Sequence, residues 1–436
     1  MGSKKVAIVG YGIEGRSALR YWQEHGADVT VCDQNAAIAL PKGVESQLGP
    51  DYLKNLERFD IIMRTAGMHP KIILAANPGV EKKITTTVNE FLRVCPTPNT
   101  IGVTGTKGKG TTSTLIQKML EAAGKKVFLG GNYGVSPFDF LPKITKDSWV
   151  VLELSSFMLY DITRSPHIGV CLMIQPEHLD WHGDVRDYYW SKRNMFAFQK
   201  DTDVAIYYAE SLRSHDIARA SPGDKIAYYD EPGAYIYKDN IMIDQTVLCK
   251  TGELQLMGQH NWQNICAAAT TAWQVVQAPD AFRKALLAFT GLPHRLEFVR
   301  EVSGIKFYND SFASDPYATN AAIGAVPGNK VIIIGGYERM LPLDTLTATV
   351  LQHRKTIRGL LLIGASAERV AAELNGAKLK NYTITTAKTM PDIVEQATKM
   401  AKKGDSVVLS PGFASFDMFK NFEERGLAFK EAVHAL

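Results

Sequence analysis

The 436-residue sequence lacks any apolar run of about 18 residues, the length that a membrane-spanning helix requires. Its five cysteines show no CxxC spacing, which indicates reduced thiols in a cytoplasmic protein and excludes a zinc site of that type. No basic run interleaved with aromatic residues is present, and the formal net charge is only +4. The N-terminal segment runs into a glycine turn, unlike a signal peptide. We therefore expect a cytoplasmic protein that binds neither nucleic acid nor membrane.

Short β-rich runs alternate with helical patterns along the whole sequence. The runs are nearly continuous in apolar character, which is typical of parallel strands covered on both faces. Segments 17–26 and 111–125 have helical periodicity and end at or beside glycine. The fold class is therefore predicted to be α/β. The predicted strands are 4–10, 27–33, 59–65, 99–105, 126–131, 148–154, 169–174, 330–336, 358–364 and 405–411.

The strand-plus-glycine-turn pattern begins three times, near residues 6, 100 and 296, which predicts three domains. We expect a Rossmann-like N-terminal domain over 1–96, a phosphate-loop ATPase domain with a mainly parallel sheet over 97–296, and a Rossmann-like C-terminal domain over 297–436.

The first glycine turn, 10–15, reads GYGIEG between a strand and a helix. In such a turn, backbone amides and a helix N-terminus face a diphosphate. Asp33 ends the next strand, where an acid would contact a ribose. The pattern fits a dinucleotide such as NAD, another nucleotide diphosphate, or a turn that only packs the helix on the strand.

The second glycine turn, 104–112, reads TGTKGKGTT and is more specific. It is typical of a phosphate-binding loop, in which amides surround phosphate oxygens and Lys109 reaches the terminal phosphates. Two positions depart from the strict pattern, because Val103 replaces the first glycine and Gly110 replaces the usual serine or threonine. We therefore assign the Mg²⁺-binding hydroxyl to Thr111.

A carboxylate and an imidazole follow two further predicted strands. Glu153 lies at the end of one, and His178 comes shortly after another. Near a phosphate loop, such groups suit a divalent metal, although each alone is more often a surface polar group.

Taken together, the motifs resemble the Mur ligase family along essentially the whole chain. The segments that carry the resemblance, in order, are TGTKGKGTT (104–112), GGN (130–132), LELSSF (152–157), EHLDWHG (177–183), GQHNWQN (258–264), GLPHR (291–295), YNDS (308–311), IIGG (333–336) and SPGFASFDMFKNFEERG (410–426). The last segment looks most like the branch that adds D-glutamate to UDP-N-acetylmuramoyl-L-alanine in peptidoglycan synthesis.

The resemblance implies an amide ligase that uses ATP. The substrate carboxylate would attack the γ-phosphate to give an acyl phosphate, and the amino acid amine would then displace phosphate. The implied cofactors are ATP and Mg²⁺, as two ions, with Lys192 matching a family lysine that is carbamylated. The catalytic residues would be Lys109, Glu153, His178 and Lys192, and the metal site would comprise Thr111, Glu153, His178 and Lys192.

Binding residues are carried over in the same way. The ATP site would include Gly105, Thr106, Lys107, Gly108, Lys109, Gly110, Thr111, Thr112, Asn261, Asn264, Arg295 and Asp310, with His260 orienting its segment. The UDP-linked substrate would contact Gly12, Ile13, Asp33, Gln34, Thr65, Gly67, Asn132 and Ser155. The first glycine turn would then serve UDP instead of NAD.

The C-terminal domain would bind the amino acid through Arg339, Ser415, Phe416 and Phe422. Two positions depart from the family pattern. Phe312 stands where a lysine is usual and removes a cation, and Arg339 replaces a lysine while keeping the charge. We therefore expect glutamate to be recognised by a changed set of donors.

Other hypotheses remain at this point. A nicotinamide-dependent oxidoreductase fits the first glycine turn and Asp33 but leaves the phosphate loop unexplained. A ligase of the folylpolyglutamate synthase type shares the glycine at position 110 but is not expected to have a UDP-binding domain. A non-catalytic nucleotide sensor conflicts with the intact charged residues. We expect a monomer with small-molecule substrates only.

Overall fold

We describe the fold from a computed structural model, which describes residues 3–132, 135–256 and 258–436. These residues form four sheets with flanking helices, so the predicted α/β class is confirmed. The chain divides into two compact units. Unit 1 comprises 1–254 and 259–288, and unit 2 comprises 255–258 and 289–436. Each unit is described by itself, and the division into three domains stays a prediction.

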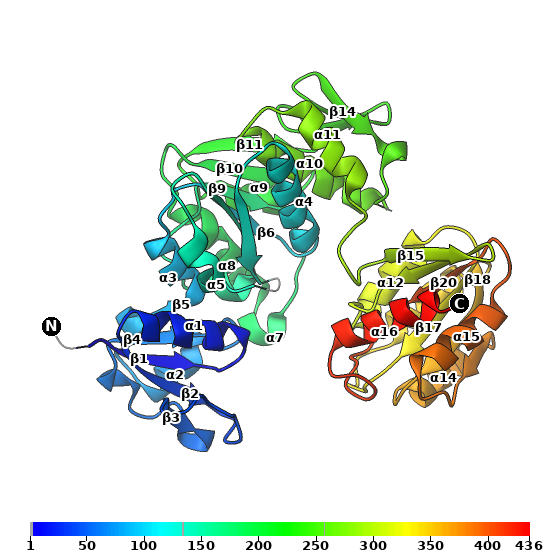
Figure 1. Cartoon of the computed structure of the whole chain (residues 1–436), viewed down its shortest axis with the longest axis horizontal. Helices are drawn as coiled ribbons and strands as arrows, with labels where there is room; N and C mark the ends of the chain where they lie inside the picture. The colour runs from blue at the N-terminus through cyan, green and yellow to red at the C-terminus, as the bar shows by residue number, and fades with distance from the viewer. Residues whose placement is uncertain (1–2, 133–134, 257) are drawn as a thin grey trace. The chain divides into compact units, whose positions relative to one another are not determined.

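The first sheet of unit 1 is five-stranded and parallel, in the order β3-β2-β1-β4-β5. Strands β2 and β3 lie on one side of β1, and β4 and β5 lie on the other side. Sheets of this kind bind ligands where the strand order reverses, which here is the carboxyl end of β1. Helix α1 lies against β1 and β2 (Figure 1). The elements are β1 (Lys5–Val9), α1 (Ile13–Glu24), β2 (Asp28–Asp33), β3 (Glu45–Leu48), β4 (Ile61–Arg64), α2 (Pro70–Ala76), β5 (Ile84–Thr86) and α3 (Thr87–Val94).

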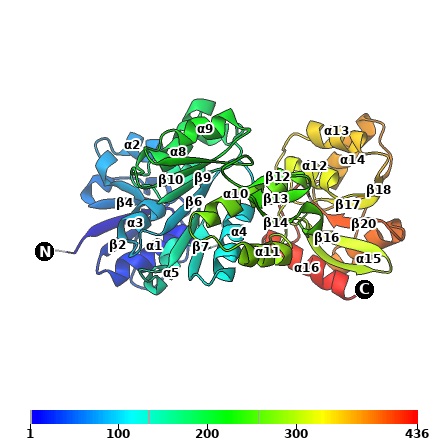
Figure 2. The same ribbon diagram turned by 90° about the horizontal axis from the view of Figure 1, so that it is seen from above.

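The second sheet of unit 1 is six-stranded and parallel, in the order β11-β10-β9-β6-β8-β7. Strand β6 is fully buried at the point where the strand order reverses. Helices α4 and α10 lie side by side (Figure 2). The strands are β6 (Thr100–Thr104), β7 (Val127–Gly131), β8 (Trp149–Glu153), β9 (Ile168–Cys171), β10 (Val204–Tyr208) and β11 (Asp224–Tyr228). The helices are α4 (Lys109–Ala122), α5 (Pro137–Phe140), α6 (Ser156–Leu159), α7 (Leu179–His182), α8 (Val185–Ala197), α9 (Leu212–Ala218), α10 (Gln259–Trp273) and α11 (Pro279–Ala288).

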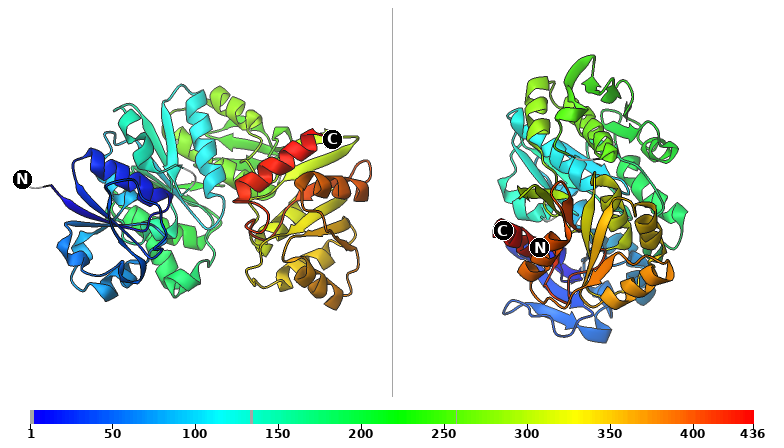
Figure 3. Two further views of the ribbon diagram at one scale, coloured as in Figure 1. Left: turned by 60° about the horizontal axis from the view of Figure 1, so that its bottom comes forward. Right: turned by 90° about the vertical axis from the view of Figure 1, so that its right-hand side faces the viewer.

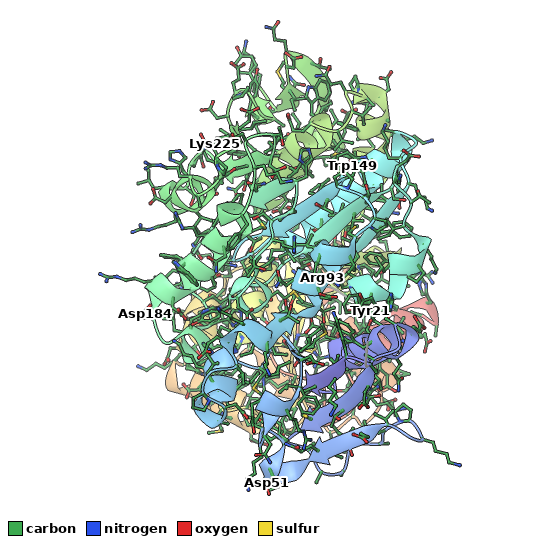
Figure 4. The ribbon with its side chains drawn as sticks, turned by 90° about the vertical axis from the view of Figure 1, so that its left-hand side faces the viewer. Tyr21, Asp51, Arg93, Trp149, Asp184 and Lys225 are labelled. Atoms are coloured by element: carbon green, nitrogen blue, oxygen red, sulfur yellow. The ribbon has the colours of Figure 1, made fainter. Side chains whose placement is uncertain are left out.

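Side chains join the two parts of unit 1. The Tyr21 ring of α1 stacks on Phe138 of α5, with ring centroids 4.0 Å apart. Buried Arg64, at the end of β4, forms two hydrogen bonds of 2.5 and 2.8 Å with Asp161 beyond α6. Figure 4 labels Tyr21 and also Asp184, whose carboxylate accepts the amide of Asp187 and caps α8. These contacts fix the first glycine turn relative to the second sheet.

A small antiparallel sheet completes unit 1. It comprises β12 (Tyr235–Tyr237), β13 (Asn240–Ile243) and β14 (Thr246–Lys250). None of these strands was predicted, because each has only three to five residues and no long apolar run.

The sheet of unit 2 has the order β15-β16-β20-β17-β18-β19 and is parallel except for the β15–β16 pair. Helix α16 lies along β15 and β16 (Figure 3). The strands are β15 (Glu297–Val302), β16 (Ile305–Asn309), β17 (Lys330–Gly335), β18 (Ile357–Ile363), β19 (Tyr382–Ile384) and β20 (Ser406–Leu409). The helices are α12 (Pro316–Ala325), α13 (Asp344–Gln352), α14 (Ala367–Gly376), α15 (Met390–Met400) and α16 (Phe422–His434).

Each of the ten predicted strands overlaps an observed strand. Their apolar side chains form the cores, and β17 is buried along its whole length. Burying a Val or Ile side chain stabilises a fold by about 1.5–3 kcal/mol, which explains why these runs are the clearest in the sequence. No helix in the described part of the chain combines the length and apolar character needed to cross a membrane.

Candidate active site

The phosphate loop connects β6 to α4 and depends on two glycines with positive φ. Gly105 has φ of +155°, and a Cβ there would lie 2.6 Å from Cβ of Leu172. Gly108 has φ of +86° and precedes the first residue of α4. A Cβ at Gly108 would lie 2.2 Å from the side-chain oxygen of Asn264. Only glycine fits both positions, so the loop can present its amides and the helix N-terminus to an anion.

The two lysines of the loop point to different partners. Nζ of Lys109 donates hydrogen bonds to the carbonyls of Gly105 and Thr106, both at 2.9 Å. Nζ of Lys107 lies 2.6 Å from the Glu177 carboxylate, in an ion pair that is largely exposed at the lysine. Lys109 therefore lies across the loop itself, where phosphate oxygens bind in such loops, whereas Lys107 connects the loop to the segment before His178.

The predicted asparagines on α10 lie against the loop. The hydroxyl of buried Thr112 donates to the side-chain oxygen of Asn264 at 3.5 Å, and the Asn264 amide donates to Asn261 at 3.1 Å. Gly110 is buried, and Thr111 is partly exposed in the first turn of α4. The loop and α10 thus form one polar surface within unit 1.

Glu153 ends β8 and is 5% exposed. Its Oε1 accepts a hydrogen bond of 3.0 Å from the Asn132 amide. Ser155, two residues later, caps α6, and its hydroxyl accepts the amide of Met158. Two residues predicted to contact the UDP-linked substrate therefore lie beside the carboxylate that was predicted to bind metal.

His178 precedes α7 in a left-handed conformation with φ of 57°, which is uncommon for a residue other than glycine. Burial lowers the pKa of His178, and the charge of Lys109 lowers it further against the opposing charge of Glu177. A neutral imidazole at neutral pH is the form that binds a metal.

Lys192 lies in α8 and is only 1% exposed. Its Nζ donates to the Gly105 carbonyl at 3.0 Å and to the Thr104 hydroxyl at 3.3 Å. Burial, followed by the charge of Lys109, lowers the pKa of Lys192 well below its ordinary value. The structure therefore brings a buried amine with a lowered pKa into contact with the start of the phosphate loop.

The predicted Mg²⁺ site fits the donors that are present. Among residues 3–132, 135–256 and 258–436, no three His, Cys, Asp or Glu side chains form a group that could hold a metal alone. Mg²⁺ usually uses one or two carboxylates together with substrate phosphates instead of an all-protein cage. The buried Glu153 carboxylate and the hydroxyls of the first α4 turn match that requirement.

The first glycine turn forms a second polar edge in unit 1. The Tyr11 amide donates to Asp33 at 2.8 Å, so Asp33 holds the turn. Thr65, after β4, donates its hydroxyl to the Val9 carbonyl. Gly10 is required here, because a Cβ would lie 2.3 Å from the Thr65 hydroxyl. The remaining predicted residues are also at this edge: Gly12 and Ile13 at the start of α1, Gln34 after β2, and Gly67 after β4.

Trp181 and His182 were not among the predicted site residues. The Trp181 indole N–H donates to the Gly67 carbonyl at 3.0 Å, which connects α7 to the loop after β4. His182 is buried, and its ring lies 4.6 Å from the Trp181 ring. The sequence signal was the WHG at 181–183, directly after His178, but no pattern showed that these rings turn inward.

In unit 2, most of the predicted residues follow the carboxyl ends of β16, β17 and β20, whereas Arg295 precedes β15 and Phe422 begins α16. Asp310 is buried after β16 and accepts the Ser410 hydroxyl at 2.6 Å. Arg339 is exposed after β17 and donates to the Ser314 carbonyl at 2.5 Å. Ser415 is buried after β20, and the neighbouring Phe416 is 64% exposed.

Phe312 packs against the side chain of Arg295 in unit 2. Its ring lies under the guanidinium of Arg295, with the central carbon 3.9 Å from the ring centroid. Its edge also packs on Phe422, which packs on His294. The position that loses a lysine therefore gains the cation of Arg295, held by cation–π contact.

Asp310→Asn should change how stability depends on pH. Burial raises the pKa of Asp310 from 3.8 to about 7. The folded carboxyl therefore keeps its proton between about pH 4 and 7 while the unfolded one loses it, so stability falls as pH rises through this window. The variant, which cannot ionise, should gain on the order of 3 kcal/mol relative to the parent by pH 8. Calorimetry of both proteins at pH 5 and pH 8 measures the difference, and parallel profiles would contradict it.

Comparison with known proteins agrees with this geometry. The family model described as the Mur ligase middle domain matches residues 103–272, and the model described as the Mur ligase glutamate ligase domain matches 294–413. The UDP-N-acetylmuramoylalanine–D-glutamate ligase of Acetivibrio thermocellus is 36% identical over 100% of this chain and 97% of its own.

The chain belongs to the Mur ligase family. Another similar Mur ligase, the UDP-N-acetylmuramoylalanine–D-glutamate ligase of Clostridium kluyveri, is 35% identical over 99% of this chain and 96% of its own. Among solved structures, the UDP-N-acetylmuramate–alanine ligase of Thermotoga maritima has a TM-score of 0.61 at 14% identity, with 99% of both chains covered. That likeness shows a shared Mur ligase fold. Ligase chemistry thus replaces the oxidoreductase hypothesis.

Proposed function

We propose that this Mur ligase adds D-glutamate to UDP-N-acetylmuramoyl-L-alanine, using ATP and releasing ADP and phosphate, as a cytoplasmic monomer in peptidoglycan precursor synthesis. The observation that carries the proposal is the phosphate loop, with Lys109 across it and the buried Lys192 donating to its Gly105 carbonyl. Glu153 ends the strand that pairs with the one before the loop, and Lys107 of the loop pairs with Glu177, the neighbour of His178. The support for the substrates is the full-length similarity to ligases of that name.

The main physical difficulty of the reaction is that an anionic carboxylate must approach the γ-phosphate of ATP. The loop amides and Lys109 would bind the phosphates and oppose that repulsion, while the first glycine turn would hold the diphosphate of UDP. Asn132 and Ser155, beside Glu153, would orient the muramoyl-alanine portion. The carboxylate oxygen would then bond to phosphorus as ADP leaves, and the amine would displace phosphate from the acyl carbon.

Mg²⁺ would be held by Thr111, Glu153, His178 and Lys192, and would supply positive charge beside the phosphates. For this, Lys192 must carry a carbamate. Its buried amine, whose pKa burial lowers, would bond to CO₂ in its unprotonated form and release one proton, which gives an anionic oxygen donor where an ammonium group could not bind metal. The carbamate would supply an oxygen donor for the second of the two proposed ions.

Phosphate release tests the function. The purified chain with ATP and Mg²⁺ should release phosphate only when both UDP-N-acetylmuramoyl-L-alanine and D-glutamate are present. L-glutamate, D-aspartate and folate substrates serve as controls in the same assay. Phosphate release that is independent of either co-substrate would defeat the proposal, and release that depends on folate instead would identify the related ligase class.

The amino acid site would depend on Arg339. Arg339→Ala should raise the KM for D-glutamate by about 10–100-fold, because a hydrogen bond between a guanidinium and a carboxylate is lost. The KM for ATP should change less than about threefold. Arg354→Ala, which replaces an exposed arginine two residues after the end of α13, is the matched control and should change neither constant. A larger effect on ATP than on glutamate would show that the carboxylate binds elsewhere.

A further inference from the structure

Three proposed metal-site residues lie in or directly beside three separate helices. Glu153 lies just before α6, His178 just before α7, and Lys192 within α8. Helices α6 and α7 have only four residues each. A single helical turn has too few internal hydrogen bonds to hold its position, so contacts from outside must place it.

One buried imidazole contacts all three helices. His182 is the last residue of α7, and its side chain is fully buried. Its Nε2 lies 2.9 Å from the hydroxyl of Ser156, the first residue of α6. Its Nδ1 lies 3.4 Å from a carboxylate oxygen of Asp187, in the first turn of α8. The backbone amide of His182 also donates to the His178 carbonyl at 3.0 Å.

A second path leads from His182 to the phosphate loop. The Tyr188 ring packs edge-on against the His182 ring, with centroids 5.3 Å apart. The Tyr188 hydroxyl lies 2.9 Å from the Thr106 hydroxyl, within the loop. Nζ of Lys192 lies 4.8 Å from the centroid of the same tyrosine ring. One continuous set of contacts therefore joins the loop to all three helices.

A buried serine, histidine and aspartate in this order could suggest a nucleophile. However, Ser156 is only 2% exposed and lies in the first turn of a helix. Its hydroxyl therefore cannot reach a substrate. The contacts among the three side chains hold the helices in place and do not form a nucleophile.

We propose that His182 is the positioning residue that holds Glu153, His178 and Lys192 in fixed positions relative to the phosphate loop. The proposal rests on the proposed function for the roles of those three residues. Without His182, α6 and α7 would each lose the contact that orients them, and the metal ligands would separate by small distances. Loss of such an orienting partner typically costs 10–100-fold in metal affinity or activity.

The test compares His182→Ala, His182→Gln and His182→Asn in the full chain. Glutamine keeps a polar atom near the Nε2 position, facing Ser156, and asparagine keeps one near Nδ1, facing Asp187. Mn²⁺ binding in the presence of ADP is measured by electron paramagnetic resonance, without turnover. We expect about 10-fold weaker Mn²⁺ binding in His182→Ala, with partial recovery in His182→Gln. In the ligase assay, the Mg²⁺ concentration for half-maximal rate should rise in parallel, while the KM for the UDP-linked substrate stays within about threefold.

Asn77→Ala is the matched control. Asn77 is buried at the end of α2, and its side chain bonds to three backbone groups outside the candidate active site. This variant should unfold at a lower temperature but bind Mn²⁺ as the parent does. Should His182→Ala fail to fold, the glutamine and asparagine variants carry the test. Parental Mn²⁺ affinity in folded His182 variants would overturn the proposal, whereas a parent that binds Mn²⁺ and ADP but shows no ligase activity would overturn only the proposed function.

Discussion

Lys109→Ala should reduce ligase turnover by at least about 10³-fold. The lysine crosses the phosphate loop and donates to two of its carbonyls, so its charge lies where the terminal phosphates of ATP would bind. Without this lysine, the loop would contact the terminal phosphates mainly through neutral backbone amides. The negative charge of the transferred phosphoryl group would then lose its nearest cation. Steady-state phosphate release at saturating substrates measures the loss.

Lys107→Ala, at the other loop lysine proposed to contact ATP, provides a graded comparison within the same loop. Lys107 has the same charge, but its ammonium group is largely exposed and pairs with Glu177. Exposed ion pairs contribute about 0–1 kcal/mol, so this variant should keep turnover within about tenfold of the parent. If Lys107→Ala were the more damaging change, the assignment of the two lysines would be reversed.

Lys192→Ala should also be inactive, with a loss of at least about 10²-fold, but it should regain part of its activity with formate or acetate. The substitution removes the proposed carbamate and opens a buried space beside the Gly105 carbonyl. A short carboxylate in that space supplies the oxygen that the carbamate would have supplied. Turnover measured against increasing formate should therefore saturate.

Two controls isolate the chemistry of this rescue. Chloride at equal ionic strength should restore nothing. Lys330→Ala removes another buried lysine, whose ammonium group donates to the Ile323 carbonyl in unit 2, and formate should not change its activity. Rescue by chloride, or equal formate effects on both variants, would contradict the carbamate.

Much of the fold could be predicted because the signals are local. The apolar runs identified ten strands, and glycine turns identified the two edges of unit 1 that we propose to bind phosphate groups. Gly105 and Gly108 also mark positions where backbone conformation and close contact both require glycine. The short strands of the β12–β14 sheet carried no such signal, because their burial depends on what packs against them.

The roles of Phe312 and His182 could not be predicted from their positions along the chain. Phe312 suggested only a lost cation, until the structure placed the Arg295 guanidinium on its ring. In the sequence, His182 is only a nearby neighbour of His178. The structure shows that His182 of α7 contacts Ser156 of α6 and Asp187 of α8.

The local sequence pattern of apolar residues and glycines thus determines the ten predicted strands and the glycine turns. The sequence also determines which chemical groups the chain offers. The burial of Lys192, the lowered pKa that follows from it and the contacts of His182 with its neighbouring helices arise only when distant segments pack together. The reason is physical: desolvation and hydrogen-bond geometry depend on what surrounds a side chain, and those surroundings come from residues far away in the chain.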